Sequence, residues 1–371
     1  MEVDVKRAVA GQVPASRGSE GSVAVVGTVT DGMSGLVGQL LGRFEAAGFA
    51  VVEDGGSPDI VLNVVDEESP RPFRRKSRGT FVAALWTRPS PPTGLEKTYP
   101  MLVRALANIS LCYVPGHGVF FTTMERGHYL VPEGDGLAAD VVRRLLPLAT
   151  SRLVIDNEFR CDLEQELWEG DSLTHELSVV GRRLDALGLL PAPFPLEELL
   201  GPRELRHLFR LYSIGGLSYG NLSARKDESR FWMSASGVDK SNLVTPGRDI
   251  LLVSDYDAAA NRMVLSVPPA IEPRRVSVDA IEHWMIYRQN PEVGAILHVH
   301  AWVEGIPATE INFPCGTAEL AASVAELVAS APDPGYAVVG LRNHGITATG
   351  RSLTAILDRL EPVLLREVPM T

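Results

Sequence analysis

The stretch "GAILHVHAW", residues 294–302, joins an apolar β-type run to two histidines that are separated by one residue. Side chains at positions i and i+2 of a strand point to the same face. His298 and His300 are therefore expected to project together from the end of a buried strand. The chain has only eight histidines, so the pair suggests two imidazole ligands for one metal ion.

A third histidine strengthens this interpretation. In "LRNHG", residues 341–345, His344 follows another apolar β-type run and precedes a glycine. If the two strands are neighbours in one sheet, the three imidazoles converge. Three imidazoles with an open fourth position are typical of a catalytic Zn²⁺ site or of a site for another divalent ion.

A carboxylate precedes the histidine pair. In "SVDAIEHWMIY", residues 277–287, Asp279 and His283 are four apart and share one face of a predicted helix. The start of that helix can present Asp279 beside the metal, as a general base or a further ligand. For His283 we favour the alternative of a packed, hydrogen-bonded side chain.

Two loops of small residues are candidates for binding an anion, "SYGNLSAR" (218–225) and "SASG" (234–237). Backbone N–H groups and hydroxyls in glycine turns bind anions. Asn221, Ser236, Gly237 and Ser277 are expected to hold a phosphate or carboxylate, although each loop taken singly is also explained as a plain turn.

Composition narrows the class of protein. The 371 residues are 45% apolar and 22% charged, which is typical of a globular protein with a sizeable core. The net charge of −11 argues against nucleic acid as the main partner. The three cysteines show no metal-binding spacing and fit a reducing compartment. No apolar run reaches the roughly 18 residues of a membrane span, and no signal peptide is evident, so we expect a cytoplasmic protein that does not bind membranes.

The pattern along the chain predicts two α/β domains. Residues 1–21 read as a flexible leader, and strands alternate with helices over residues 22–155. This alternation predicts a Rossmann-like, mainly parallel domain of unknown role, with an added hairpin or meander. Its loop "GTVTDGMSG" (27–35) lacks the G-x-G-x-x-G spacing, so a simple turn is favoured over nucleotide binding. The pattern changes around residues 150–170, and residues 165–371 are expected to form the second domain.

The order of six motifs, "GNLSAR", "SASG", the Ser-x-acid helix, "HVHAW", "GTAEL" and "NHG", resembles the class II aldolase/adducin family over about residues 170–371. This resemblance implies an α/β/α sandwich around a mostly antiparallel sheet, and a homo-oligomer, usually a tetramer. It implies a divalent metal, most often Zn²⁺ but also Fe²⁺, Mn²⁺ or Co²⁺, held by His298, His300 and His344. A phosphate pocket is implied at Gly220, Asn221, Ser236, Gly237 and Ser277.

The activity implied by the resemblance is that of a metal-dependent lyase or epimerase. It would act on a small phosphorylated hydroxycarbonyl compound through a metal-stabilised enediolate, with Asp279 as the base, and aldol cleavage is favoured over epimerisation. Two alternatives stay open. The same site can serve decarboxylation, dehydration or iron-dependent oxidation, or the chain can be a non-catalytic, adducin-like binding protein.

The chain departs from the pattern that the family resemblance implies. Aldolases of the family carry Glu where this chain has Asp279, whereas the epimerases carry Asp. Val278 stands where the aldolases have a second pocket serine. The segment between "HVHAW" and "GTAEL" and the segment after "NHG" are both short, and no counterpart of the family's C-terminal tyrosine is found. These differences leave the substrate and the reaction open.

Overall fold

The computed structural model describes residues 21–53, 57–76, 80–123, 127–188, 200–211 and 220–370. Apart from Gly21, the predicted leader lies outside these residues. The chain divides into two compact units, and the division falls between Thr150 and Ser151. Among the described residues, no helix is long and apolar enough to cross a membrane.

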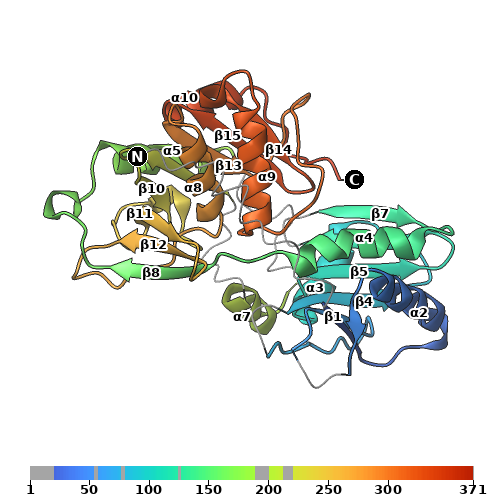
Figure 1. The fold of residues 1–371 in the computed structure, drawn as a ribbon. Helices are drawn as coiled ribbons and strands as arrows, with labels where there is room; N and C mark the ends of the chain where they lie inside the picture. Colours follow the sequence, from blue (N-terminus) through green and yellow to red (C-terminus); the bar gives the residue numbers. More distant parts are fainter. Residues whose placement is uncertain are drawn as a thin grey trace. The chain divides into compact units, whose positions relative to one another are not determined.

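The first unit is built on a seven-stranded sheet with the order β2-β1-β3-β4-β5-β6-β7 (Figure 1). The strands are parallel from β2 to β5, and β5, β6 and β7 form an antiparallel meander. The sheet is therefore mixed, the meander lies where the sequence predicts it, and the Rossmann-like assignment stays a prediction. The strands are β1 (Ser22–Val26), β2 (Ala50–Val51), β3 (Ile60–Val64), β4 (Phe81–Thr87), β5 (Ile109–Val114), β6 (Gly118–Thr123) and β7 (His128–Pro132).

In the described part of this unit, three helices accompany the sheet: α2 (Asp31–Ala46), α3 (Leu95–Arg104) and α4 (Leu137–Thr150). In α2 the buried side chains recur at helical spacing, at Met33, Leu36, Val37, Leu40 and Phe44. The predicted glycine-rich loop leads into this helix. Its Gly27 has a φ of 95°, and a Cβ there would lie 2.1 Å from the carbonyl oxygen of Val64. The turn therefore requires glycine for its backbone geometry.

The second unit is built on an eight-stranded sheet with the order β14-β15-β13-β9-β10-β11-β12-β8. Every pair is antiparallel except β12 with β8, which is parallel. The sheet is therefore mostly antiparallel. The strands are β8 (Asp156–Arg160), β9 (Asn221–Arg225), β10 (Phe231–Ser234), β11 (Ile250–Asp257), β12 (Arg262–Ser266), β13 (Ala295–Val299), β14 (Val338–Leu341) and β15 (Gly345–Gly350).

Helices lie on both faces of the second sheet. Residues of β9 and β15 hydrogen-bond to α8 on one face, through Ser223 and Thr347. On the other face, α10 packs against Gly350 and contacts α5. The helices are α5 (Ser172–Ala186), α7 (Pro202–Leu211), α8 (Ala280–Gln289), α9 (Ala318–Ala329) and α10 (Leu353–Leu360), with 3-10 turns η1 (Gln165–Leu167), η2 (Lys240–Asn242) and η3 (Pro334–Tyr336).

Strand β13 connects the fold to the site. Its five residues are all buried, because β15 and β9 flank it and helices cover both faces. Side chains alternate, so Leu297 and Val299 belong to the apolar core while His298 points to the opposite face. On that face His298 lies in register with Asn221 of β9 and Thr347 of β15. Three polar side chains from three strands therefore meet at one buried position.

Candidate metal centre

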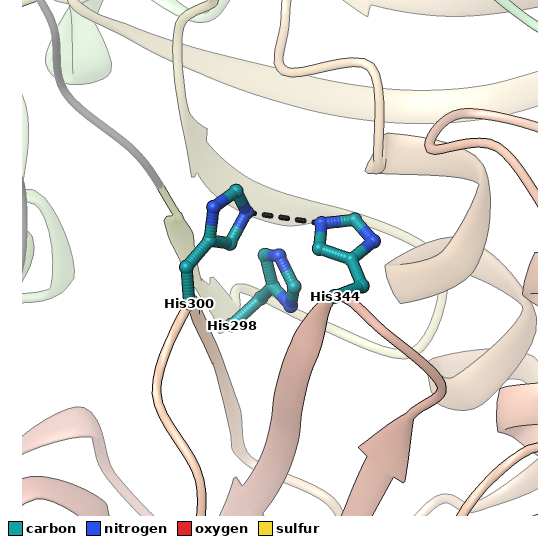
Figure 2. Close-up of side chains that lie close together, drawn as sticks. All are labelled: His298, His300 and His344. Atoms are coloured by element: carbon teal, nitrogen blue, oxygen red, sulfur yellow. Dashed lines mark hydrogen bonds between the residues drawn. The ribbon is translucent and has the colours of Figure 1, made fainter. Parts of the chain in front are cut away.

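The imidazoles of His298, His300 and His344 lie together in the second unit, as Figure 2 shows. One ring nitrogen from each lies within 4.8 Å of the other two, and all three side chains are buried. The Nε2 atoms of His300 and His344 are 2.9 Å apart. The ring centroids are separated by 4.6–5.1 Å. The structure thus brings together the three histidines that the two sequence motifs contain.

His344 reaches this place because of the tight turn between β14 and β15. Asn343 has a φ of 57°, in the left-handed region that asparagine tolerates better than most residues. A Cβ on Gly345 would lie 2.3 Å from the carbonyl oxygen of Val299. The absence of a side chain at Gly345 therefore lets β15 approach the end of β13. The strand that pairs with β13 is thus β15, which follows His344. The sequence motif instead draws attention to β14, the strand that precedes His344.

His298 is held as a neutral imidazole with a defined tautomer. Its Nδ1 lies 3.1 Å from the carbonyl oxygen of Ile346, which can only accept a hydrogen bond. Nδ1 therefore carries the proton, and Nε2 keeps its lone pair. This Nε2 is buried and has no hydrogen-bond partner among the described residues. Burial lowers the pKa of His298 to about 4, so the ring is neutral at neutral pH.

These features fit a divalent metal ion. Metal-binding histidines usually donate the second ring N–H to a carbonyl or carboxylate, and this bond orients the ring. The bond from His298 to Ile346 is of that kind, and it leaves a buried nitrogen lone pair beside two further imidazoles. A set of three neutral nitrogen donors suits Zn²⁺ and other divalent ions of the first transition row.

Asp279 lies beside this group at the N-cap position of α8, and it is buried. Its Oδ2 accepts a hydrogen bond of 2.7 Å from the Asn221 side-chain amide. Burial raises the pKa of Asp279, while the nearby His344 imidazole and the Asn221 amide act in the opposite direction. Asn221 thus contacts the carboxylate directly, and its side chain is fixed by that bond.

The glycine before Asn221 has a packing role. Gly220 has a φ of 80°, and a Cβ there would lie 2.4 Å from the carbonyl oxygen of His298. Glycine is needed so that the start of β9 can lie against β13. A role for Gly220 and Asn221 in binding phosphate stays a prediction.

The other residues predicted for the phosphate pocket lie at one bridge between two segments. Ala235 and Val276 form an isolated antiparallel bridge. The Ser236 N–H donates to the carbonyl of Arg275, and the Ser277 N–H donates to that of Ser234. Gly237 follows with a φ of 65°. Ser236, Gly237 and Ser277 therefore come from one small substructure, and their binding role stays a prediction.

The structure adds three residues that the sequence motifs do not mark. The side chain of Lys240 is buried; burial lowers its pKa to about 8, while Asp279 and Asp239 act in the opposite direction. Cys315 Sγ lies 3.2 Å from His344 Nε2 and 3.4 Å from its Nδ1, so it packs against the ring. Glu282, one helical turn after Asp279, is also buried. Its position three residues after Asp279 was the one available signal.

His283 is a hydrogen-bonded core residue. Its Nδ1 lies 2.7 Å from the Ser223 hydroxyl, which in turn lies 2.8 Å from the Tyr287 hydroxyl. Burial lowers the pKa of His283 well below its usual value. This arrangement agrees with the packed, hydrogen-bonded alternative that we favour for His283.

The glycine-rich loop of the first unit leads to a different feature. One side of α2, along its whole length, and the start of α4 line an open depression of about 950 Å³. Its charged lining includes Asp31, Glu133 and Asp135 against a single arginine, Arg43. This acidic lining gives no support to phosphate binding there.

Comparison with known proteins bears on the second unit. Residues 204–303 match the family model described as the class II aldolase and adducin N-terminal domain. The chain carries a class II aldolase/adducin segment. The segment includes Asn221, Asp279, His298 and His300, whereas His344 lies beyond its end.

Relatives of this class II aldolase/adducin segment include enzymes named methylthioribulose-1-phosphate dehydratase. The one from Stenotrophomonas maltophilia (strain K279a) is 32% identical over 100 residues, which cover 27% of this chain and 41% of the relative. The one from Enterobacter sp. (strain 638) is 40% identical over 81 residues, covering 22% of this chain and 34% of the relative. The chain thus matches about a third to two fifths of the length of these relatives.

Solved structures similar to this chain include an L-fuculose 1-phosphate aldolase, with 19% identity and a TM-score of 0.35. The alignment covers 52% of this chain and 82% of the aldolase. YgbL from Klebsiella pneumoniae gives 19% identity and a TM-score of 0.34, over 51% of this chain and 84% of YgbL. Likeness at this level does not define a fold.

Proposed function

We propose that the second unit is a metal-dependent lyase acting on a small, phosphorylated hydroxycarbonyl compound. The observation that carries this proposal is the convergence of three buried imidazoles beside the buried carboxylate of Asp279. Buried polar side chains are costly unless they are paired or bind a ligand. Their concentration at the end of one strand therefore supports a reaction centre.

His298, His300 and His344 are the residues that would hold the metal, and Zn²⁺ is the first candidate. A bound divalent ion supplies Lewis acidity toward the carbonyl and hydroxyl oxygens of the substrate. His298 contributes an imidazole whose Nδ1 bond to Ile346 keeps Nε2 available.

Asp279 is the proposed base. Because Oδ2 accepts the hydrogen bond from Asn221, the carboxyl group is oriented, and the remaining oxygen, Oδ1, can take up or return a proton. Burial raises the pKa of Asp279, and a carboxylate with a higher pKa is a stronger base. Asn221 acts on Asp279 as a positioning residue in this arrangement, and its own contact with a substrate phosphate stays a proposal.

An anionic substrate group fits the surroundings of Asp279. Lys240 is buried close enough to Asp279 and His298 for its charge to affect the pKa of both. We propose that this cation, the hydroxyls of Ser236 and Ser277 and the backbone of Gly220 and Gly237 receive a phosphate. Hydroxyls and N–H groups in glycine turns are suited to that role.

Dehydration is the second candidate reaction. It is favoured by the name of the relatives, methylthioribulose-1-phosphate dehydratase. Removal of a proton beside a carbonyl by Asp279 is common to dehydration and to epimerisation at such a carbon. Carbon–carbon cleavage stays the first candidate because the resemblance in the motifs favoured it. A homo-oligomer, a cytoplasmic location and an independent first domain also stay proposals.

Metal analysis of the purified full-length chain tests the proposal first. We expect about one transition-metal ion per chain, lost in His298→Ala and retained in His117→Ala, whose histidine is exposed in the first unit. A wild-type chain that binds no transition metal, with or without added Zn²⁺, would contradict the proposal.

Product analysis then separates the reactions. A panel of ketose phosphates is incubated with the metal-loaded protein, and the products are identified by mass spectrometry and NMR. Carbon–carbon cleavage yields two smaller compounds, dehydration yields one compound lighter by a water molecule, and epimerisation leaves the mass unchanged. No turnover of any panel member by metal-loaded protein would favour the non-catalytic alternative.

A further inference from the structure

Glu282 is a buried carboxyl group that the proposed chemistry does not use. It lies on α8 one turn after Asp279 and is 2% exposed. Its Oε1 accepts a short hydrogen bond of 2.6 Å from the Thr347 hydroxyl, and its Oε2 has no partner among the described residues. Burying a carboxyl group costs free energy. The presence of Glu282 at this position, with a single strong hydrogen bond, therefore requires an explanation.

Thr347 connects Glu282 to the candidate metal centre. It is paired in register with His298 across β15 and β13, and its Oγ1 lies 3.4 Å from His298 Nδ1. A hydroxyl group has a single proton and two lone pairs. Because that proton is directed to Glu282, the hydroxyl presents a lone pair toward Nδ1.

The direction of the hydroxyl determines which nitrogen of His298 carries the ring proton. Nδ1–H donates to the Ile346 carbonyl at 3.1 Å, and the Thr347 lone pair is compatible with that proton. If the hydroxyl proton instead pointed at Nδ1, it would favour the tautomer protonated on Nε2. That tautomer has lost the lone pair that faces the other imidazoles, and it cannot bind a metal through Nε2.

We propose that Glu282 is a positioning residue that acts through Thr347 to protect the tautomer of His298 that the Ile346 carbonyl favours. By accepting the Thr347 proton, Glu282 prevents the hydroxyl from donating to Nδ1, and so keeps Nε2 available as a ligand atom. The relay requires only that Oε1 accepts a hydrogen bond, and a charged or a neutral carboxyl group can do so. Burial raises the pKa of Glu282 to about 8, and Asp279 acts in the same direction; the relay operates on either side of that pH.

This inference rests on the proposed metal site, but it can be tested without metal. Long-range ¹H–¹⁵N spectra of the metal-free, full-length protein report which nitrogen of His298 is protonated. We expect Nδ1–H in wild type. In Glu282→Leu the Thr347 proton loses its acceptor, and we expect a detectable population of the Nε2–H tautomer.

The same substitution should weaken Zn²⁺ binding, measured by competition with a chromogenic chelator, by about tenfold to a hundredfold, the range typical of residues that orient metal ligands. Replacing a buried carboxyl group that has no cationic partner among the described residues with leucine is not expected to unfold the unit. A thermal melt of each variant checks this.

Three variants separate the relay from a merely structural role. Glu282→Gln keeps a carbonyl acceptor, and Thr347→Val removes the hydroxyl proton, so both should keep the Nδ1–H tautomer and bind Zn²⁺ within about threefold of wild type. The double variant Glu282→Leu/Thr347→Val should recover the tautomer and most of the affinity, because the competing donor is gone. A structural role predicts that the double variant is at least as impaired as Glu282→Leu.

An unchanged tautomer in Glu282→Leu, or a double variant as impaired as the single one, would overturn the inference. If wild type binds no Zn²⁺, the proposed function fails, whereas the tautomer measurements still decide whether Glu282 acts through Thr347.

Discussion

The two sheets of this chain bury different kinds of polar side chain. Among the described residues of the first unit, the buried polar side chains are neutral hydroxyls and one amide, for example Asn63, Ser110 and Thr122. In the second unit, among the described residues, the buried set includes imidazoles, carboxylates and an ammonium group: Lys240, Asp249, Asp279, Glu282, His283, His298, His300 and His344.

The difference lies in what the strands carry. β3 is buried along its whole length and has one polar residue, Asn63, whose side-chain amide donates to the carbonyl of Arg71. β13 is equally buried but carries His298, whose Nε2 has no hydrogen-bond partner among the described residues. A buried polar side chain that is hydrogen-bonded, as Asn63 is, fits a structural core, whereas a buried imidazole nitrogen that keeps its lone pair beside two further imidazoles indicates a place for a ligand.

The largest expected effect comes from removing one imidazole. His298→Ala deletes a nitrogen donor from the group of three, and we expect a loss of Zn²⁺ affinity of at least about a hundredfold with activity reduced to background. Metal content and turnover measure this. His117→Ala is the matched control. An equal loss of metal in that variant would contradict the assignment of the metal site to the second unit.

The next effect concerns the carboxylate. Asp279→Asn preserves size and the contact with Asn221 but cannot take up a proton, so kcat should fall by about 10²–10⁴. Metal content should stay at the wild-type level. Steady-state kinetics with the identified substrate checks this, with Asp162→Asn, an exposed aspartate of the second unit, as the control. Full activity in Asp279→Asn would exclude Asp279 as the base.

A core substitution in the first unit should lower stability and leave metal binding unchanged. Leu62 is fully buried in β3, and Leu62→Ala should lower the free energy of unfolding by about 2–5 kcal/mol, because it removes buried apolar surface and leaves a cavity. Urea unfolding measures the loss, and Zn²⁺ affinity should be unchanged. A loss of metal binding in still-folded protein would show that the two units are energetically coupled.

The smallest effect concerns the N-cap of α5. Although burial raises the pKa of Asp171, its bonds to the Lys226 ammonium, the Thr174 N–H and the Trp232 indole hold that pKa below its usual value. A lowered folded-state pKa gives stability that is present above the unfolded-state pKa of about 3.9 and is lost as the pH falls through the folded-state value.

Asp171→Asn keeps a capping side chain but loses the charge that faces the Lys226 ammonium, which should cost up to about 1 kcal/mol near neutral pH, and the difference from wild type should shrink below about pH 4. Urea midpoints across that pH range test it. Asp185→Asn, on the exposed side of the same helix, is the control. A difference that is independent of pH would contradict an electrostatic origin.

The sequence alone determined what depends on local periodicity. Alternation along a strand placed His298 and His300 at the end of a buried run, and the spacing to Asp279 placed a carboxylate at the start of the helix before it. The buried residues of α2 and the meander of β5, β6 and β7 follow from the same local patterns. These features depend only on two or three consecutive turns or strands. They can therefore be predicted from the local sequence, without information on contacts between distant residues.

Only the tertiary structure decided which distant residues meet. Gly345 lets β15, and not β14, lie against β13, and this pairing sets Thr347 opposite His298. Packing of α8 against the sheet then places Glu282 in hydrogen-bond contact with Thr347. Packing likewise places the charge of Lys240 close to Asp279. Strand pairing and packing depend on residues far apart in the chain, where periodicity carries no information, so the supporting residues of the site emerged only from the folded molecule.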